Sequence, residues 1–351
     1  MNQLKPKQQG VALIIVLLIV ALVSVLATEM GGRLQLQIKR ASNIKENNQA
    51  YWYAMGAEQY ARKSIKQLMD NDGDVIHLEQ PWNEEFVFPI EGGGIQAQLV
   101  DMQSCFNLNV LKTPDSSTNS LRTNTPVANG NVRNGNNNVP VNNGSQLPES
   151  VAAFERLLQS SELKIPSFNI EIVRDSLIDW LDQDNRPTGR GAEDSEYESR
   201  PFPYVAANNF MVHKSELRMV NGVEVPWLRE LLKLVCVLPN DSLFSINVNT
   251  VSEENAAVIA AAARLSLTDA SSVLANRGSN GFQTTADFLN EPSIQAANLN
   301  AEEKTWFNVT TTHFILHTKT RYNDATFAMQ TLFKVDSSKN VIVIRREFSG
   351  F

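Results

Sequence analysis

An apolar run at residues 11–27 constrains this chain more than any other feature, and Lys5, Lys7 and Gly10 precede it. A run of about seventeen apolar residues reaches the lower limit for a membrane-spanning helix. Such a segment can be a cleaved signal, a permanent anchor, or a helix that follows a short leader. Because the lysines lie before the run, the positive-inside rule places the N-terminus in the cytoplasm and the rest of the chain outside.

The residues after the apolar run favour a long helix over a cleaved secretory signal. Val25-Leu26-Ala27 could serve as a signal-peptidase site, but the run is long for a signal and the helical pattern continues to residue 68. Gly31 and Gly32 are a weak point where this helix could bend. An apolar stripe with helical spacing comprises Tyr51, Ala54, Ala57, Ala61, Ile65 and Leu68. A continuous helix over 11–68 would be about 85 Å long, so its outer half must pack on a soluble body.

Gly10 before a long apolar helix resembles the class III leader of pilins and pseudopilins. The resemblance implies that a prepilin peptidase cuts after Gly10 and that Val11 becomes a methylated N-terminus. Most members of that family carry Glu at the fifth mature position, whereas this chain has Ile15. In lacking this Glu, the chain resembles the type II secretion minor pseudopilin K family. A carboxylate inside a membrane is costly unless it is paired, so a subunit without it suits an end position in a filament.

The composition argues against two classes of function, nucleic-acid binding and catalysis. The net charge of −7 argues against nucleic-acid binding, which needs a basic face. The four histidines lie in no recognisable catalytic motif, so an enzyme, such as an anchored periplasmic one, is not expected. Cys105 and Cys236 can form one disulfide if the body is exported, and the alternative is two free buried thiols.

Alternating apolar residues predict strands early and late in the chain, with helices between them. Residues 85–90 and 95–101 flank Glu91-Gly92-Gly93-Gly94 and predict a hairpin, and the final strands are expected at 311–318, 325–335 and 341–346. Residues 113–150 are rich in Asn, Ser, Thr, Gly and Pro, a composition typical of a disordered loop. A minority interpretation is an Asn-rich recognition loop.

These patterns predict an α+β fold, in which a long N-terminal helix packs on an antiparallel sheet with a large α-helical insertion domain. The expected units are a leader at 1–10, a transmembrane helix at 11–30, a helix with the first strands at 31–112, the loop at 113–150, the helical insertion at 151–300 and the last strands at 301–351. Within the insertion, 244–249 is predicted as a strand, 252–264 as an alanine-rich helix, and Thr268 as the cap of the next helix.

An oxygen-rich loop follows Asp182 and is the strongest candidate for a ligand site. Glu193 stands at the twelfth place counted from Asp182, as in an EF-hand. However, Arg186 takes a ligand position and Pro187 takes the position of the required glycine, so the loop is not an EF-hand. Minor pseudopilin K proteins carry a similar acidic Gly-Ala-Glu-Asp stretch, and the resemblance implies Ca²⁺ there. A plain solvated acidic loop is the alternative. The expected ligands are Asp182, Asp184, Thr188, Glu193, Asp194 and Asn208.

Two weaker patterns are better explained by structure than by function. Residues 256–264 and 269–277 resemble a helix-hairpin-helix module, but their connecting turn has no glycine to hold a phosphate. His313 and His317 share one face of a predicted strand and could form a metal pair. Half-exposed polar strand positions are the more ordinary explanation for both histidines.

The resemblance covers nearly the whole chain and implies a structural role at the tip of the type II secretion pseudopilus, in export of folded proteins across the outer membrane. Implied partners are the minor pseudopilins I and J, the major pseudopilin, the inner-membrane secretion platform and the prepilin peptidase. The expected location is the bacterial inner membrane, with a single span and a periplasmic body. The alternative with the same leader is a minor pilin of a type IV pilus, used in adhesion or DNA uptake.

Overall fold

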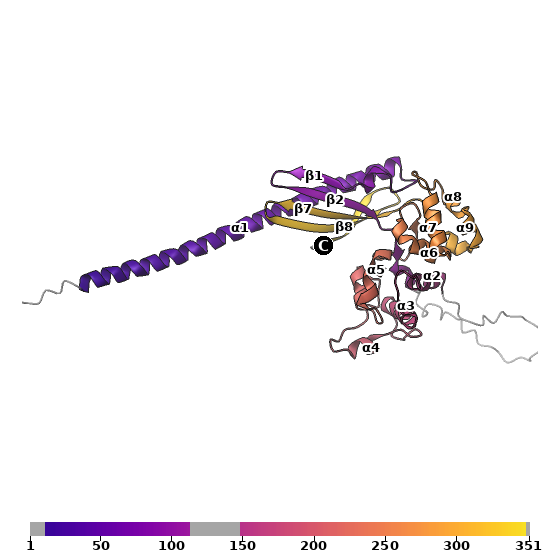
Figure 1. Ribbon diagram of the computed structural model, residues 1–351, viewed down its shortest axis with the longest axis horizontal. Coiled ribbons are helices and arrows are strands. Elements are labelled where there is room, and N and C mark those ends of the chain that lie inside the picture. Colours follow the sequence, from indigo (N-terminus) through magenta and orange to yellow (C-terminus); the bar gives the residue numbers. More distant parts are fainter. Residues whose placement is uncertain (1–10, 113–147, 349–351) are drawn as a thin grey trace, which may run out of the picture.

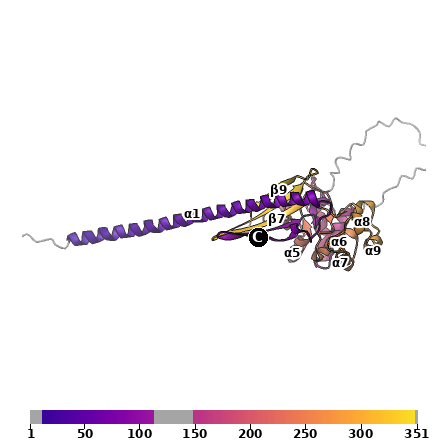
Figure 2. The same cartoon turned by 90° about the horizontal axis from the view of Figure 1, so that it is seen from above.

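A computed structural model of the chain describes residues 11–112 and 148–348. The leader prediction at Gly10 and residues 113–147 of the predicted Asn-rich loop at 113–150 therefore lie outside the described residues. The end of that loop prediction is wrong, because α2 already begins at Glu149 with Pro148 as its N-cap. The first helix, α1 (Val11–Asn71), runs without a break for 61 residues, through Gly31 and Gly32. Figures 1 and 2 show its first half projecting away from the body as an isolated rod, while its second half lies along the sheet.

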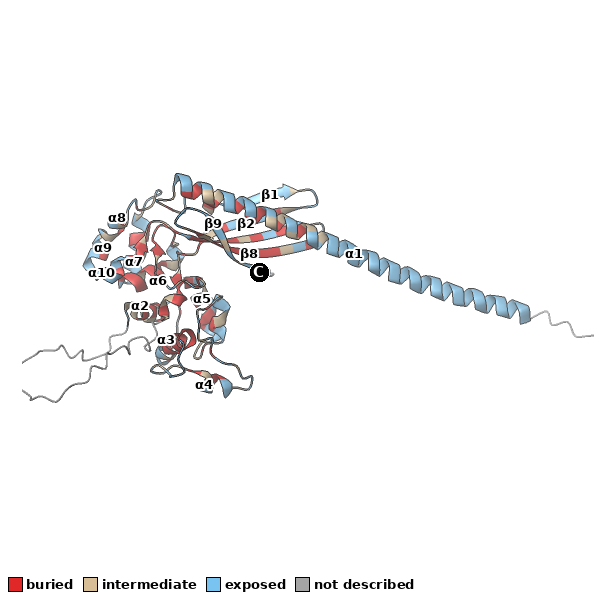
Figure 3. Cartoon of the chain, turned by 180° about the vertical axis from the view of Figure 1, so that it is seen from behind, coloured by how far each residue is buried: buried red, intermediate tan, exposed pale blue. Residues whose placement is uncertain are grey.

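The two halves of α1 differ in burial, as Figure 3 shows by colour. Residues 11–45 are exposed along their whole length, and this half contains a segment long and apolar enough to cross a membrane. The second half presents one buried stripe to the sheet, which follows the predicted spacing apart from the half-buried Tyr51. Its buried members are Ala50, Ala54, Ala57, Glu58, Ala61, Ile65, Leu68 and Met69.

The antiparallel sheet has the strand order β1-β2-β7-β8-β9. These strands are β1 (Phe86–Ile90), β2 (Gly93–Asp101), β7 (His313–Tyr322), β8 (Ala325–Val335) and β9 (Val341–Phe348). The predicted early hairpin is confirmed, and its strand β2 pairs directly with the late strand β7, with Asp101 opposite Phe314. Everything between these two strands is therefore an insertion at one end of the sheet.

The insertion forms a helical domain with its own core, at the opposite end of the sheet from the projecting half of α1 (Figure 1). Its longer helices are α2 (Glu149–Leu158), α3 (Ser167–Leu181), α5 (Val225–Leu234), α6 (Ala256–Ala263) and α7 (Leu267–Asn276). Its shorter helices are η2 (Leu108–Leu111), α4 (Asp194–Glu198), η4 (Lys214–Arg218), η5 (Glu253–Asn255), α8 (Thr285–Leu289), α9 (Pro292–Ala296) and α10 (Ala301–Lys304). The α+β class and the helical insertion are confirmed.

Two short parallel strand pairs tie the helical domain together. Strand β3 (Phe106–Asn107) pairs with β4 (Val235–Cys236), and β5 (Ile246–Asn247) pairs with β6 (Phe307–Asn308). Cys105 and Cys236 form a disulfide beside the first pair, with Cα atoms 5.7 Å apart. Of the two alternatives for the cysteines, the disulfide is therefore confirmed.

Asp101 joins the sheet to the helical domain from the end of β2. Its buried carboxylate accepts hydrogen bonds from the hydroxyls of Thr250 and Thr311, each at 2.6 Å, and from Asn247 Nδ2 at 3.0 Å. Burial raises the pKa of Asp101, while these hydrogen bonds to the charged form lower it. The junction is thus polar but fully paired, which fixes where the inserted domain leaves the sheet.

Three details of the sequence prediction are wrong. The cap of α7 is Ser266, whose side chain accepts from Asp269 N, and Thr268 already lies inside the helix. The predicted strand at 244–249 shrinks to the two residues of β5, because β6 offers only a short partner segment. His313 is buried rather than half-exposed, since β7 is covered at this end by the junction with the helical domain.

Candidate functional site

The last turns of α3 supply carboxylates that organise the following loop. Asp175 and Asp179 are four residues apart and so lie on one side of the helix. Asp179 Oδ1 accepts from the backbone N–H of Thr188, and Asp175 Oδ2 accepts from that of Arg190, both at 2.9 Å. These contacts fold residues 183–193 back onto α3. Because the loop backbone lies against these carboxylates, it can return its own acidic residues toward the end of α3.

Two glycines permit this close approach. A Cβ atom at Gly191 would lie 1.9 Å from Asp179 Oδ2, and one at Gly189 would lie 2.4 Å from Asp175 Oδ2. Gly189 also has a φ of +50°, which favours glycine. The glycines of the loop therefore serve to bring its backbone against the α3 carboxylates.

The loop and the end of α3 together form a carboxylate cluster made of Asp182, Asp184 and Glu193. One oxygen from each lies within 4.8 Å of the others. Asp182 and Glu193 are buried, at 8% and 2% exposure, whereas Asp184 is exposed. Carboxylates this close repel one another unless a proton or a cation compensates their charge.

Several side-chain oxygens in and beside the cluster are buried without a hydrogen-bond partner among the described residues. They are both carboxylate oxygens of Glu193, Oδ2 of Asp179 and Oδ1 of Asn208. Asn208 adopts a left-handed conformation with φ of 47°, and its Nδ2 donates to Asn185 Oδ1 at 3.3 Å. Buried acceptors with no donor are rare in folded proteins, and a bound ion is one of the standard explanations.

The electrostatics of the site agree with this geometry. Burial raises the pKa of Asp179 to about 7, and Asp182 and Asp175 add to the rise. Burial also raises the pKa of Glu193 to about 7, together with the charges of Asp179, Asp182, Asp194 and Asp184. Two carboxyl groups are therefore poised to hold protons near neutral pH, and to release them to solvent when a cation binds.

The donor set fits a hard cation. Ca²⁺ takes six to eight oxygen ligands from carboxylates, amide oxygens and water, and tolerates irregular geometry. Of the predicted ligands, the structure brings together Asp182, Asp184 and Glu193, with the Asn208 oxygen buried and unpaired near the same loop. When bound, the cation would supply positive charge that offsets the repulsion among these carboxylates.

Two of the predicted ligands, Thr188 and Asp194, make hydrogen bonds that hold the loop. One residue near the cluster, Asp179, was not predicted. The backbone of Thr188 binds Asp179, and Asp194 Oδ1 accepts from the N–H of Ala206 at 2.9 Å. Asp179 is absent from the sequence prediction, although its spacing of three residues from Asp182 on α3 was a usable signal. The return of the loop onto α3, which brings Asp179 to the cluster, cannot be read from local pattern.

The other predicted site residues lie far from this cluster. Val11 is the first described residue, and Ile15 is exposed on the projecting half of α1. His317 faces the helical domain, where burial and the charge of Lys214 lower its pKa. The helix pair α6–α7 packs inside the helical domain, with Ala270 and all alanines of α6 except Ala260 buried, which agrees with the structural interpretation of the resemblance to a helix-hairpin-helix.

Comparisons with known proteins agree on one family. Models described as "Type II secretion system (T2SS), protein K" match residues 104–240 and 246–310. Type II secretion system protein K of Aeromonas hydrophila is 31% identical over 351 residues, covering 98% of both chains. That of Klebsiella pneumoniae is 30% identical over 343 residues, covering 97% of this chain and 96% of the relative.

A solved structure extends the likeness to the fold. One chain of the crystal structure of the GspK-GspI-GspJ complex, from the enterotoxigenic Escherichia coli type 2 secretion system, matches with a TM-score of 0.72 and 27% identity. The match covers 89% of this chain and 100% of that chain. The sheet and the inserted helical domain therefore recur in a protein solved as part of a three-component complex.

Proposed function

Because the chain belongs to the type II secretion system protein K family, we propose that it is a minor pseudopilin at the tip of the type II secretion pseudopilus. It binds the minor pseudopilins I and J, with the major pseudopilin below, and acts in pseudopilus assembly and in export of folded proteins from the periplasm across the outer membrane. Its role is assembly rather than catalysis.

The observation that carries this proposal is the division of α1. Residues 11–45 are exposed and include the apolar segment, whereas the second half is built into the sheet. An apolar helix that packs on none of the described residues of its own chain needs lipid or other helices around it. In the precursor, α1 anchors the chain in the bacterial inner membrane at the secretion platform, with the body in the periplasm. After cleavage behind Gly10 by the prepilin peptidase, the apolar half packs among the helices of neighbouring subunits.

The helical domain supports a place at the tip. It is inserted between β2 and β7 and extends beyond the end of the sheet opposite the projecting helix (Figure 1). A body enlarged in this way would be difficult to stack within a filament shaft. At the tip, no subunit has to be placed above it.

The carboxylate cluster serves this role as a structural Ca²⁺ site. Asp182, Asp184 and Glu193 hold the cation, with Asp179 and Asn208 beside them, and the bound ion fixes the 183–193 loop on α3. The support is the convergence of the three carboxylates and the unpaired buried oxygens next to them.

The tip proposal is tested by co-expressing residues 42–351 with the bodies of I and J from the same bacterium. Removing residues 1–41 takes away no buried residue of the described chain, because burial begins at Ala50. The expected result is a complex that survives size-exclusion chromatography in buffer containing calcium. Failure to co-purify would count against a tip complex. Normal protein secretion by a strain lacking the chain would favour the type IV pilus alternative.

A further inference from the structure

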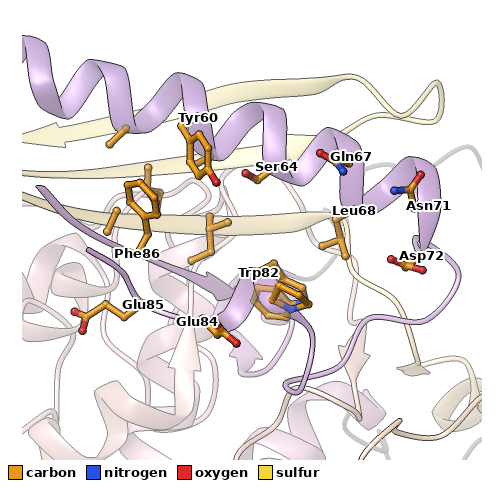
Figure 4. A pocket seen from close by; sticks show the side chains of 16 residues that line it. Tyr60, Ser64, Gln67, Leu68, Asn71, Asp72, Trp82, Glu84, Glu85 and Phe86 are labelled. Atoms are coloured by element: carbon orange, nitrogen blue, oxygen red, sulfur yellow. The ribbon is translucent and has the colours of Figure 1, made fainter. Parts of the chain in front are cut away.

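A groove of about 460 Å³ lies between α1 and the β1–β2 hairpin. Figure 4 shows Tyr60, Ser64 and Leu68 reaching toward it from the helix, with Trp82 and Phe86 on the opposite side. We call it the α1–β1 groove. It is separate from the carboxylate cluster, which lies in the helical domain, and no role described above uses it.

The groove exists because α1 crosses the sheet above β7 and β8 and leaves the β1 edge partly uncovered. Ala57 and Ala61 are among the α1 side chains that line it, and they are too short to fill the space. The rings of Tyr60 and Phe86 stack with centroids 4.9 Å apart and close one end. Trp82 donates its N–H to Gln80 at 2.9 Å, so its polar atom is satisfied and its ring carbons face the groove.

The charges around the groove have one sign. Asp72, Glu84 and Glu85 are exposed and line it, and none of its 16 lining residues is Lys, Arg or His. Within the described residues, none of these three carboxylates forms an ion pair with the chain's own cations. A groove with apolar side chains in its wall, whose only charged lining residues are acidic, is complementary to an apolar side chain flanked by basic ones.

We propose that the α1–β1 groove receives a basic, amphipathic helix of a neighbouring pseudopilin subunit. An aliphatic or aromatic side chain of that helix enters between Leu68 and Trp82, and its Lys or Arg side chains meet Glu84, Glu85 and Asp72. This inference rests on the proposed function, because it takes its occupant from the same assembly.

The length and shape of the groove favour a helix. From Ala57 to Asn71, the last residue of α1, the helix rises about 21 Å at about 1.5 Å per residue, which matches four turns of a helix laid alongside. Helix-in-groove recognition uses this arrangement of apolar anchors with charged flanks. The exposed part of α1 in this chain shows that a pseudopilin-type helix can offer such chemistry, with Arg33, Lys39, Arg40 and Lys45 among apolar residues.

Charge reversal on the full-length chain tests the groove. The chain is purified in detergent, and binding of the I–J pair to it is measured by biolayer interferometry at low and high salt. We expect Glu84→Lys/Glu85→Lys to weaken binding at least tenfold and to reduce its salt dependence. The matched control Glu162→Lys/Glu254→Lys reverses two exposed carboxylates on the helical domain and is expected to bind within twofold of wild type.

A second variant fills the groove without changing charge. Ser64→Trp places a large side chain at the edge of the groove, and we expect the same loss of binding with an unchanged melting temperature. Binding of both groove variants at wild-type strength overturns the inference. An effect of the variants on self-association of the chain alone, with I–J binding unchanged, would make a second copy the occupant and also overturn it. Failure of the wild-type chain to bind I–J counts against the proposed function instead.

Discussion

Glu58 on α1 and Arg346 on β9 form a two-point ion pair although they are 288 residues apart, with Nε to Oε2 at 2.6 Å and Nη2 to Oε1 at 2.8 Å. Glu58 is fully buried, and Thr331 also donates to its Oε2 at 3.1 Å. Next to this pair, Arg62 donates to the carbonyl of Val341 at 2.9 Å. The last strand is thus held on the long helix through side chains, in addition to its hydrogen bonds with β8.

Arg346→Ala should destabilise the body strongly, because it leaves the Glu58 carboxylate buried without its cation. Breaking an ion pair from one side costs about 3 kcal/mol or more when both charges are buried. Because the Arg346 side chain is 38% exposed, we expect about 1 to 3 kcal/mol here. Chemical denaturation of residues 42–351 measures the loss. The double variant Glu58→Leu/Arg346→Met is the control, since replacing both charges by apolar groups should recover most of the stability. A loss below about 0.5 kcal/mol for Arg346→Ala, within the usual range for surface substitutions, would show that the pair contributes little.

Removing the disulfide should also cost stability, because it closes a loop with a sequence separation of 131 residues. Cross-links across loops of this size stabilise by about 5 kcal/mol in the chain-entropy model. Cys105→Ala/Cys236→Ala is expected to unfold at a lower urea concentration than the oxidised wild type. Wild-type protein with a reducing agent should approach the variant, and the variant itself should not respond to that agent. Equal midpoints for oxidised and reduced wild type would contradict the prediction.

Calcium should raise the melting temperature of the chelated wild type and release or absorb heat on titration. Glu193→Gln should lose this response, because it removes a buried carboxylate from the cluster. Without calcium, the same variant should be at least as stable as wild type, since it relieves repulsion among Asp179, Asp182 and Glu193. Glu196→Gln is the matched control on the exposed side of α4 and should respond like wild type. If Glu193→Gln only disrupted the fold, the variant would instead be less stable than wild type both with and without calcium.

The contribution of His313 to the stability of the body should fall as the pH drops below about 6.5, the ordinary pKa of histidine. Asp179 and Glu193, whose pKa values are raised to about 7, act in the opposite direction over this range, so the contribution of His313 has to be measured by itself. Burial and the charge of Lys334 lower the pKa of His313 to about 4, although Asp241 partly opposes this. Below pH 6.5 the unfolded chain binds a proton that the folded chain refuses, so the stabilisation present above 6.5 is lost progressively toward pH 4. The loss reaches up to about 3 kcal/mol for a shift of this size.

His313→Gln isolates this contribution. Unfolding free energies of wild type and variant are measured by denaturant titration between pH 7 and 4.5. The difference between the two proteins should shrink or reverse as the pH falls, because the variant has no imidazole to protonate. Parallel profiles over the whole range would assign the acid sensitivity to other groups.

Ile15→Glu should impair entry of the chain at the tip. In the precursor a glutamate there would place a carboxylate in the membrane, which is costly unless an amine pairs with it. A subunit at the end of the filament has no neighbour to supply that amine. The measurement is secretion by a strain that carries the variant as its sole copy, with Ile15→Leu as control. Wild-type secretion by both would show that the absent carboxylate does not specify the tip position.

The sequence alone determined the elements whose signals are local. The apolar run and the helical stripe predicted α1, glycines between alternating residues predicted the β1–β2 hairpin, and the alternation at 325–335 matches β8. It also predicted the acidic loop and named three residues that come together there, because carboxylates and glycines are dense within one short segment. Helical and strand periodicities are properties of neighbouring residues, so they can be read before folding is considered.

Only the tertiary structure decided which distant groups meet and which become buried. It placed β2 against β7 across the whole helical insertion, brought Asp179 to the acidic loop, and buried His313 at the junction. It also paired Glu58 with Arg346 and left the α1–β1 groove uncovered. These outcomes depend on how helices and strands pack over long sequence separations, and local pattern carries no information about such packing.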